Sequence, residues 1–227
     1  MARQLTLDLP HETALGRDDF LVTDANRTAV ATLDAPDLWP QGRMLLIGPE
    51  GSGKTHLAAI WAADHGAAHV DAAALTADEA DPLARAGGAV IVEDAHRVAG
   101  VPAAEAALFH LWNLCAARGC RLLLTARGPA RDWALSLPDL QSRMAALPLT
   151  RIEAPDEALL AAVLVKLFAD RQISASSGLI SWLVPRMDRD LGLARRLVGA
   201  LDMAALAAGK APTRQMAADI LHRLSEN

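Results

Sequence analysis

The octapeptide "GPEGSGKT", residues 48–55, fits the pattern G-x-x-x-x-G-K-[ST]. Glycines let such a turn curl so that its N–H groups point inward at a polyphosphate, at the N-terminus of a helix. A compact apolar run at 44–47 precedes the turn, and helical spacing follows it from residue 55 to about residue 66. This strand–turn–helix context predicts a phosphate-binding loop rather than a structural glycine turn.

The residues of this loop have separate expected roles. Lys54 is expected to reach the β- and γ-phosphates of a nucleotide, and the Thr55 hydroxyl is expected to ligate Mg²⁺. The whole loop and the histidine after it form the expected nucleotide-binding set: Gly48, Pro49, Glu50, Gly51, Ser52, Gly53, Lys54, Thr55 and His56.

Two later apolar runs end in residues that suit nucleotide chemistry. The run "AVIVED", residues 89–94, predicts a buried strand that places Glu93 beside Mg²⁺ and Asp94 where it orients a water molecule. The alternative is that these two acids only cap a loop and have no role at the metal. The run "LLLTARGP", residues 122–129, puts Thr125 at a strand tip, where it can hydrogen-bond the γ-phosphate or that water; a threonine there is also common without such a role.

The alternation of strands and helices predicts the fold class. Expected strands lie at 44–47, 89–92, 122–124 and 149–152; a helix at 26–33 precedes them, and helices at 55–66 and 103–118 lie between them. This order implies right-handed crossovers and a parallel sheet covered on both faces. From residue 155 only helices are expected, at 156–171, 177–187, 190–208 and 213–225. We therefore expect an α/β domain at 20–154 and a small helical lid domain at 155–227.

Composition excludes several classes of protein. The net charge of the 227 residues is −5, which argues against a broad basic face that coats DNA. No apolar run approaches the roughly 18 residues of a membrane span, and the N-terminus has no signal-peptide pattern, so a cytoplasmic chain without membrane contact is expected. Cys115 and Cys120 are expected to be buried thiols rather than half of a zinc site. The tryptophans are expected in the core.

Two arginine-bearing segments suit phosphate recognition. Arg143 ends "LPDLQSR", and an arginine fork is always charged and binds phosphate oxygens in pairs. An exposed helix arginine without function is the alternative. In "GLARRLVGALD", Arg195 or Arg196 could fold back onto a bound nucleotide. Only one of them is expected to do so, because neighbouring helical positions diverge by about 100°.

The opening stretch "RQLTLDLPHE", residues 3–12, has leucines at alternate positions. Leu5, Leu7 and Leu9 fit one face of an edge strand. They also fit a docking peptide that a partner reads in extended form.

Together, these motifs resemble the AAA+ module of the DnaA family of replication initiators over residues 20–225. The segment "DDFLVTDANRTAV", residues 18–30, is similar to the part that walls the adenine site, which implies contacts from Phe20 and Leu21. The resemblance implies a sensor role for Thr125, a trans-acting arginine finger at Arg143 and a second sensor at Arg195. The family's helix-turn-helix domain has no counterpart here, so DNA contact is expected only indirectly.

A short DnaA-like module with a Q-L-x-L-x-L peptide at its start is similar to the Hda-type regulators of that family. This resemblance implies that residues 1–19 are a clamp-binding peptide and linker. The residues implied to contact the DNA polymerase sliding clamp are Gln4, Leu5, Leu7 and Leu9. It also implies that Arg143 stimulates hydrolysis of the ATP held by DnaA. The implied cofactors are ADP or ATP with Mg²⁺, and the implied location is near the replisome on the nucleoid.

The same resemblance bears on intrinsic activity. Glu93 stands where the family usually has aspartate, and Ala126 where it often has an acid, which implies weak or no ATPase activity of the chain itself. Three alternatives stay open: a helicase-loader or transposition-helper type that hydrolyses its own ATP, a scaffold that binds nucleotide only for stability, and a DNA-binding regulator. A homodimer that masks the opening peptide is also compatible with the sequence.

Overall fold

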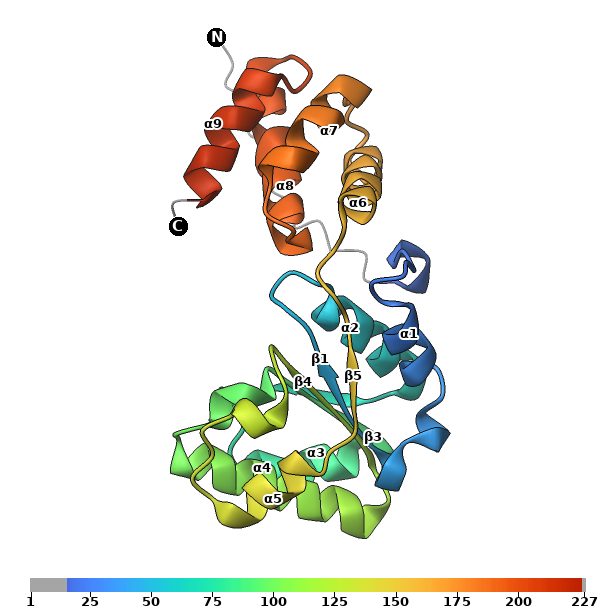
Figure 1. Cartoon of the computed structure of the whole chain (residues 1–227), viewed down its shortest axis with the longest axis vertical. Coiled ribbons are helices and arrows are strands. Elements are labelled where there is room, and N and C mark those ends of the chain that lie inside the picture. Colours follow the sequence, from blue (N-terminus) through green and yellow to red (C-terminus); the bar gives the residue numbers. More distant parts are fainter. Residues whose placement is uncertain (1–15, 226–227) are drawn as a thin grey trace, which may run out of the picture.

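The computed structural model describes residues 16–225. Figure 1 shows a layered α/β part, in which helices cover both faces of a sheet, and a group of helices formed by the last third of the chain. The predicted fold class, an AAA+-type α/β module followed by a helical lid, is confirmed.

The sheet has five parallel strands in the order β2-β3-β4-β1-β5. Their bounds are β1 (Arg43–Ile47), β2 (Ala68–Asp71), β3 (Ala89–Glu93), β4 (Arg121–Ala126) and β5 (Leu149–Arg151). Four of them lie at the predicted positions. The prediction lacked the edge strand β2, because its four residues are half-buried and exposed in alternation and form no apolar run.

Helices pack on both faces of this sheet. They are α1 (Arg27–Leu33), α2 (Lys54–His65), α3 (Ala77–Ala86), α4 (Pro102–Arg118) and α5 (Pro138–Ala145). Side chains of β1 alternate between the two cores: Leu45 and Ile47 join the core with α3, α4 and α5, whereas Met44 and Leu46 join the core with α1 and α2. Burial on both faces is what a parallel sheet requires. The helix α3 was not predicted from the sequence.

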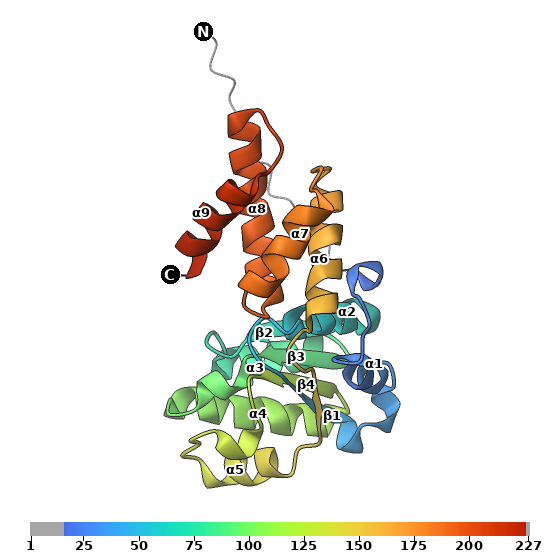
Figure 2. The ribbon, with the colours of Figure 1, turned by 45° about the horizontal axis from the view of Figure 1, so that its top comes forward.

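The lid consists of α6 (Glu157–Asp170), α7 (Ser177–Leu183), α8 (Leu191–Ala208) and α9 (Arg214–Ser225), which share a core of their own. The side chains of Asp156, Ser176 and Asp190 accept backbone N–H groups at the starts of α6, α7 and α8. Such N-caps explain why these starts fall within one residue of the prediction. Figures 1 and 2 place the lid against the α/β part on the side of α2.

The cysteines and the tryptophans of the predicted helices lie in or against the hydrophobic cores. Cys115 and Cys120 are buried free thiols, as predicted, and burial raises the pKa of Cys115 to about 12. Trp61 and Trp112 are buried in the cores of the α/β part, and Trp182 packs half-buried against the lid core. Among the described residues, no helix has the length and apolar character to cross a membrane.

Candidate functional site

The glycine-rich loop links the end of β1 to the start of α2. Gly51 and Gly53 have φ angles of +68° and +101°, which side chains rarely adopt. At Gly48 the backbone passes so close to the residue after β5 that an added Cβ would lie 2.5 Å from the Ile152 carbonyl oxygen. These glycines are therefore needed for the curled path that the sequence predicted.

Lys54 lies buried at the first position of α2. Its Nζ donates hydrogen bonds to the carbonyl oxygens of Gly48, at 2.8 Å, and Pro49, at 2.7 Å. Burial lowers the pKa of Lys54 below its ordinary value, with smaller opposing effects from nearby acids. A buried ammonium group whose hydrogen-bond acceptors within residues 16–225 are two neutral carbonyl oxygens is suited to pair with an anionic group brought to this loop.

Thr55 and Glu93 converge at the same edge of the sheet. The Thr55 hydroxyl donates to Glu93 Oε2 at 3.0 Å, and His69 Nε2 lies 3.1 Å from Glu93 Oε1. Hydroxyl and carboxylate oxygens are ligands that Mg²⁺ prefers, and it is usually held by one or two carboxylates plus phosphates and water. The described residues hold no group of three or more His, Cys, Asp or Glu side chains that could bind a metal. The pair thus fits Mg²⁺ bound together with a nucleotide. His69 was missed because β2 was missed.

Asp94 and Thr125 are joined across neighbouring strand ends. The Asp94 N–H donates to Thr125 Oγ1 at 3.0 Å, and Asp94 has a left-handed φ of +49°. Thr125 is only 2% exposed. The structure thus brings these two predicted residues together, with the backbone of one fixed by the hydroxyl of the other. His96, whose pKa is lowered mainly by burial, has its Nδ1 4.0 Å from Asp94 Oδ1.

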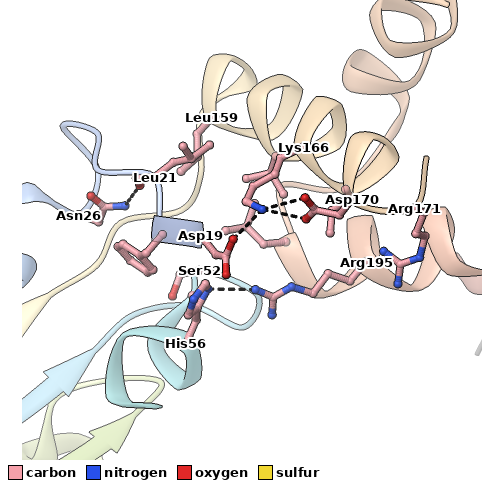
Figure 3. Close-up of a pocket in the computed structure, with 15 residues that line it drawn as sticks. Asp19, Leu21, Asn26, Ser52, His56, Leu159, Lys166, Asp170, Arg171 and Arg195 are labelled. Carbon is pink, nitrogen blue, oxygen red and sulfur yellow. Dashed lines mark hydrogen bonds and ion pairs between the residues drawn. The ribbon is translucent and has the colours of Figure 1, made fainter. Parts of the chain in front are cut away.

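A cavity of about 260 Å³ opens between the α/β part and the lid (Figure 3). Its lining brings together predicted residues from distant parts of the sequence, among them Phe20 with Leu21, His56, and Arg195. Apolar and charged side chains of α6 and α8 together form the wall on the lid side, and Ser52 and Gly53 extend the cavity to the glycine-rich loop. The cavity is therefore continuous with the predicted phosphate site.

Polar contacts fasten the lid to the α/β part around this cavity (Figure 3). Arg195 Nη2 donates to His56 Nδ1 at 3.1 Å, and the Phe20 ring meets the His56 ring edge to face at 5.2 Å. Burial lowers the pKa of Arg195. Lys166 of α6 pairs with Asp19 at 2.7 Å and with Asp170. Sequence reasoning missed Lys166 and Asp19, because no motif marks a pair that forms only when the lid docks.

The start of α8 rests directly on the glycine-rich loop. Leu191 N donates to the Gly51 carbonyl oxygen at 2.9 Å, and a Cβ added to Gly51 would lie 1.9 Å from Asp190 Oδ1. The Asp190 carboxylate cannot move freely, because it caps α8 through Gly192 N and Leu193 N. The lid therefore touches the loop that would wrap the phosphates.

This contact predicts a large effect of Gly51→Ala. The left-handed φ alone should cost about 1–2 kcal/mol in the free energy of unfolding, and the clash with Asp190 should add to it. Gly209→Ala is a matched control, because Gly209 has a similar φ of +62° and no atom near its added Cβ. Urea denaturation should show a larger loss for Gly51→Ala; equal losses would contradict the proposed role of the contact.

Arg143 lies away from this cavity. It is an exposed residue of α5, at the end of the α/β part opposite the lid (Figure 1). Its guanidinium lies 5.3 Å from the Phe109 ring centroid, and it forms no ion pair with any carboxylate of the described residues. Gln4, Leu5, Leu7 and Leu9 lie outside the described residues, so their expected role stays a prediction.

Comparison with solved structures shows that the fold is that of the AAA+ P-loop module. Domain III of the replication initiation protein DnaA from Thermotoga maritima aligns with a TM-score of 0.79 and 16% identity, over 92% of this chain and 96% of that chain. DnaA from Aquifex aeolicus, in its AMPPCP-bound structure, aligns with a TM-score of 0.63 and 18% identity, over 85% of this chain and 67% of that chain. A variant of Thermotoga maritima RuvB aligns with a TM-score of 0.69 and 16% identity, over 92% of this chain and 72% of that chain.

Two other comparisons gave no match: no protein-family model matches the chain, and no curated protein does. At identities this low, the structural likeness establishes the fold alone.

Proposed function

We propose that the chain binds an adenine nucleotide with Mg²⁺ between its α/β part and its lid. One observation carries this proposal: the glycine-rich loop, the Thr55–Glu93 pair and the cavity that reaches Arg195 all meet at one edge of the sheet. Lys54 and the loop N–H groups would hold the phosphates, and Thr55 and Glu93 would hold the metal, which screens phosphate charge. Phe20 and Leu21 would contact the base. The AMPPCP-bound DnaA structures support this reading by fold analogy.

We further propose that the chain is an Hda-type regulator that stimulates ATP hydrolysis by the initiator DnaA. In this proposal the opening peptide tethers the chain to the sliding clamp, which raises its effective concentration near DnaA on DNA. Arg143 then enters the initiator's ATP site and stabilises charge that develops on the γ-phosphate. Exposure of Arg143 and its position away from the chain's own cavity support a role on a second protein. The proposal also implies replisome association in the cytoplasm.

The second candidate is an AAA+ ATPase of the helicase-loader or transposition-helper type. One observation favours it: the Thr125 hydroxyl accepts the backbone N–H of Asp94, so it lies beside the strand end that carries the acid expected to orient an attacking water. Steady-state ATPase assays on the isolated chain separate the candidates. The regulator should hydrolyse ATP no faster than its Lys54→Ala variant, whereas an ATPase should exceed that background many-fold.

The tether makes a separate prediction. Gln4→Ala combined with Leu5→Ala should reduce capture of the chain by immobilised sliding clamp at least tenfold, because both lost side chains belong to the proposed docking peptide. Leu38→Ala is the matched control, since Leu38 is a leucine that is 81% exposed elsewhere on the chain. Undiminished capture of the double variant would remove the tether from the proposal.

A further inference from the structure

Glu105 is a buried carboxylate that the nucleotide site does not use. It lies on the first turns of α4 and is 0% exposed. No lysine or arginine of the described residues forms an ion pair with it. A buried, unpaired carboxylate is costly unless hydrogen bonds satisfy it, so its donors indicate what it stabilises.

Those donors come mainly from the start of α5. Oε2 accepts from Leu137 N at 2.8 Å, from Ser136 N at 2.9 Å and from Ser136 Oγ at 2.9 Å. Oε1 accepts from Gly100 N at 3.0 Å. Burial by itself would raise the pKa of Glu105, but these N–H and hydroxyl donors outweigh it and hold the pKa below its ordinary value. The group is therefore ionised at neutral pH.

The start of α5 has no cap of its own. Leu137 is its N-cap residue and offers no side-chain acceptor, and Pro138 follows at the first helical position. In an ordinary capping box, a glutamate of the same helix accepts the N-cap N–H. Here Glu105 of α4 accepts it instead, so a neighbouring helix fixes where α5 begins. α4 also supplies Phe109 beneath Arg143.

The same carboxylate reaches back toward the chain's own nucleotide site. Gly100 follows the short 3-10 helix Ala95–Val98, which comes directly after Glu93 and Asp94. One side chain thus joins the loop after β3 to the start of α5. The orientation of α5 is set relative to the strand end that carries the two acids.

We propose that Glu105 is a positioning residue: it fixes the start of α5 and so holds Arg143 in the orientation in which it enters the partner's ATP site. This inference rests on the proposed regulatory function. Glu105→Gln keeps the shape of the side chain but replaces one acceptor oxygen with an NH₂ donor. This donor cannot accept the N–H groups that now bind the carboxylate. The amide should release the start of α5 without removing Arg143.

The test measures single-turnover hydrolysis of DnaA-bound ATP at increasing concentrations of the chain, with clamp loaded on DNA. Glu105→Gln should lower the maximal rate at least tenfold, with the half-saturating concentration and the chain's own ADP affinity within twofold of wild type. When Glu105→Gln is combined with Arg143→Ala, the maximal rate should not fall below that of Arg143→Ala alone, because Glu105 acts through Arg143. A general structural defect would instead lower the rate of the double variant further. Glu79→Gln, which alters the capping box of α3, is the control and should hydrolyse at the wild-type rate.

The outcomes separate the inference from the function on which it rests. Wild-type stimulation by Arg143→Ala would overturn the proposed function itself. Loss in Arg143→Ala together with a normal rate in Glu105→Gln would overturn only the positioning role. If Glu105→Gln fails to fold, Ser136→Ala decides instead: it removes one donor to Glu105 and should lower the maximal rate about threefold, and a wild-type rate would contradict the inference.

Discussion

Arg143→Ala should lower the stimulated hydrolysis of DnaA-bound ATP about a thousandfold, because trans-acting arginines supply roughly 10³ to 10⁵ in rate. The guanidinium is exposed on α5 and has no carboxylate partner among the described residues, so its removal breaks no ion pair within this part of the chain. Clamp capture and nucleotide affinity should stay at wild-type levels. The assay is single-turnover hydrolysis of labelled ATP on the initiator, in the presence of clamp on DNA.

Two further variants sharpen this prediction. Arg143→Lys keeps the charge but loses the planar fork, and it should recover only a small part of the rate. Arg131→Ala removes another exposed arginine, which lies 3.7 Å from a carboxylate oxygen of the adjacent Asp132, and it should leave stimulation unchanged. Full stimulation by Arg143→Ala would show that another group acts on the initiator.

Lys54→Ala should reduce affinity for ADP and ATP with Mg²⁺ at least a hundredfold. Hydrogen bonds to a charged group contribute about 1.5–3 kcal/mol each, and the loss of two phosphate contacts at the low end corresponds to about that factor. Lys54 is only 8% exposed, and its ammonium group already lies at the loop that would hold the phosphates. Isothermal titration calorimetry with each nucleotide measures the effect.

Lys210→Ala is the matched control for this variant, because Lys210 is an exposed lysine just beyond α8. It should bind nucleotide as the wild type does. The fold should survive Lys54→Ala, since burial lowers the pKa of Lys54 and the charged form is therefore disfavoured by its surroundings. A folded Lys54→Ala chain that binds nucleotide within threefold of wild type would contradict the assigned site.

Local patterns explain why much of the fold was predictable from the sequence. The glycine-rich loop combines a fixed residue pattern with a strand before it and a helix after it. The lid helices carry capping residues at their starts, which sequence reasoning can find. The helix α3 also has a capping box at its start, formed by Thr76 and Glu79. It was not predicted, because its sequence is polar and contains a proline.

The parts that were not predictable depend on contacts between distant residues. Arg195 and His56 are 139 positions apart, and no local pattern indicates that their side chains meet. The pairing of Lys166 with Asp19 likewise forms only when the lid docks on the segment before α1. Glu105 resembles any surface glutamate of an alanine-rich helix until the fold buries it against α5.

One measurement tests the central claim most directly: the single-turnover hydrolysis of labelled ATP bound to DnaA, before and after addition of the wild-type chain with ADP and clamp loaded on DNA. The proposal predicts that the chain accelerates hydrolysis at least about a thousandfold and that omission of the clamp removes most of the gain. An unchanged rate on the initiator, accompanied by ATP hydrolysis by the chain alone, would contradict the claim and establish the ATPase alternative.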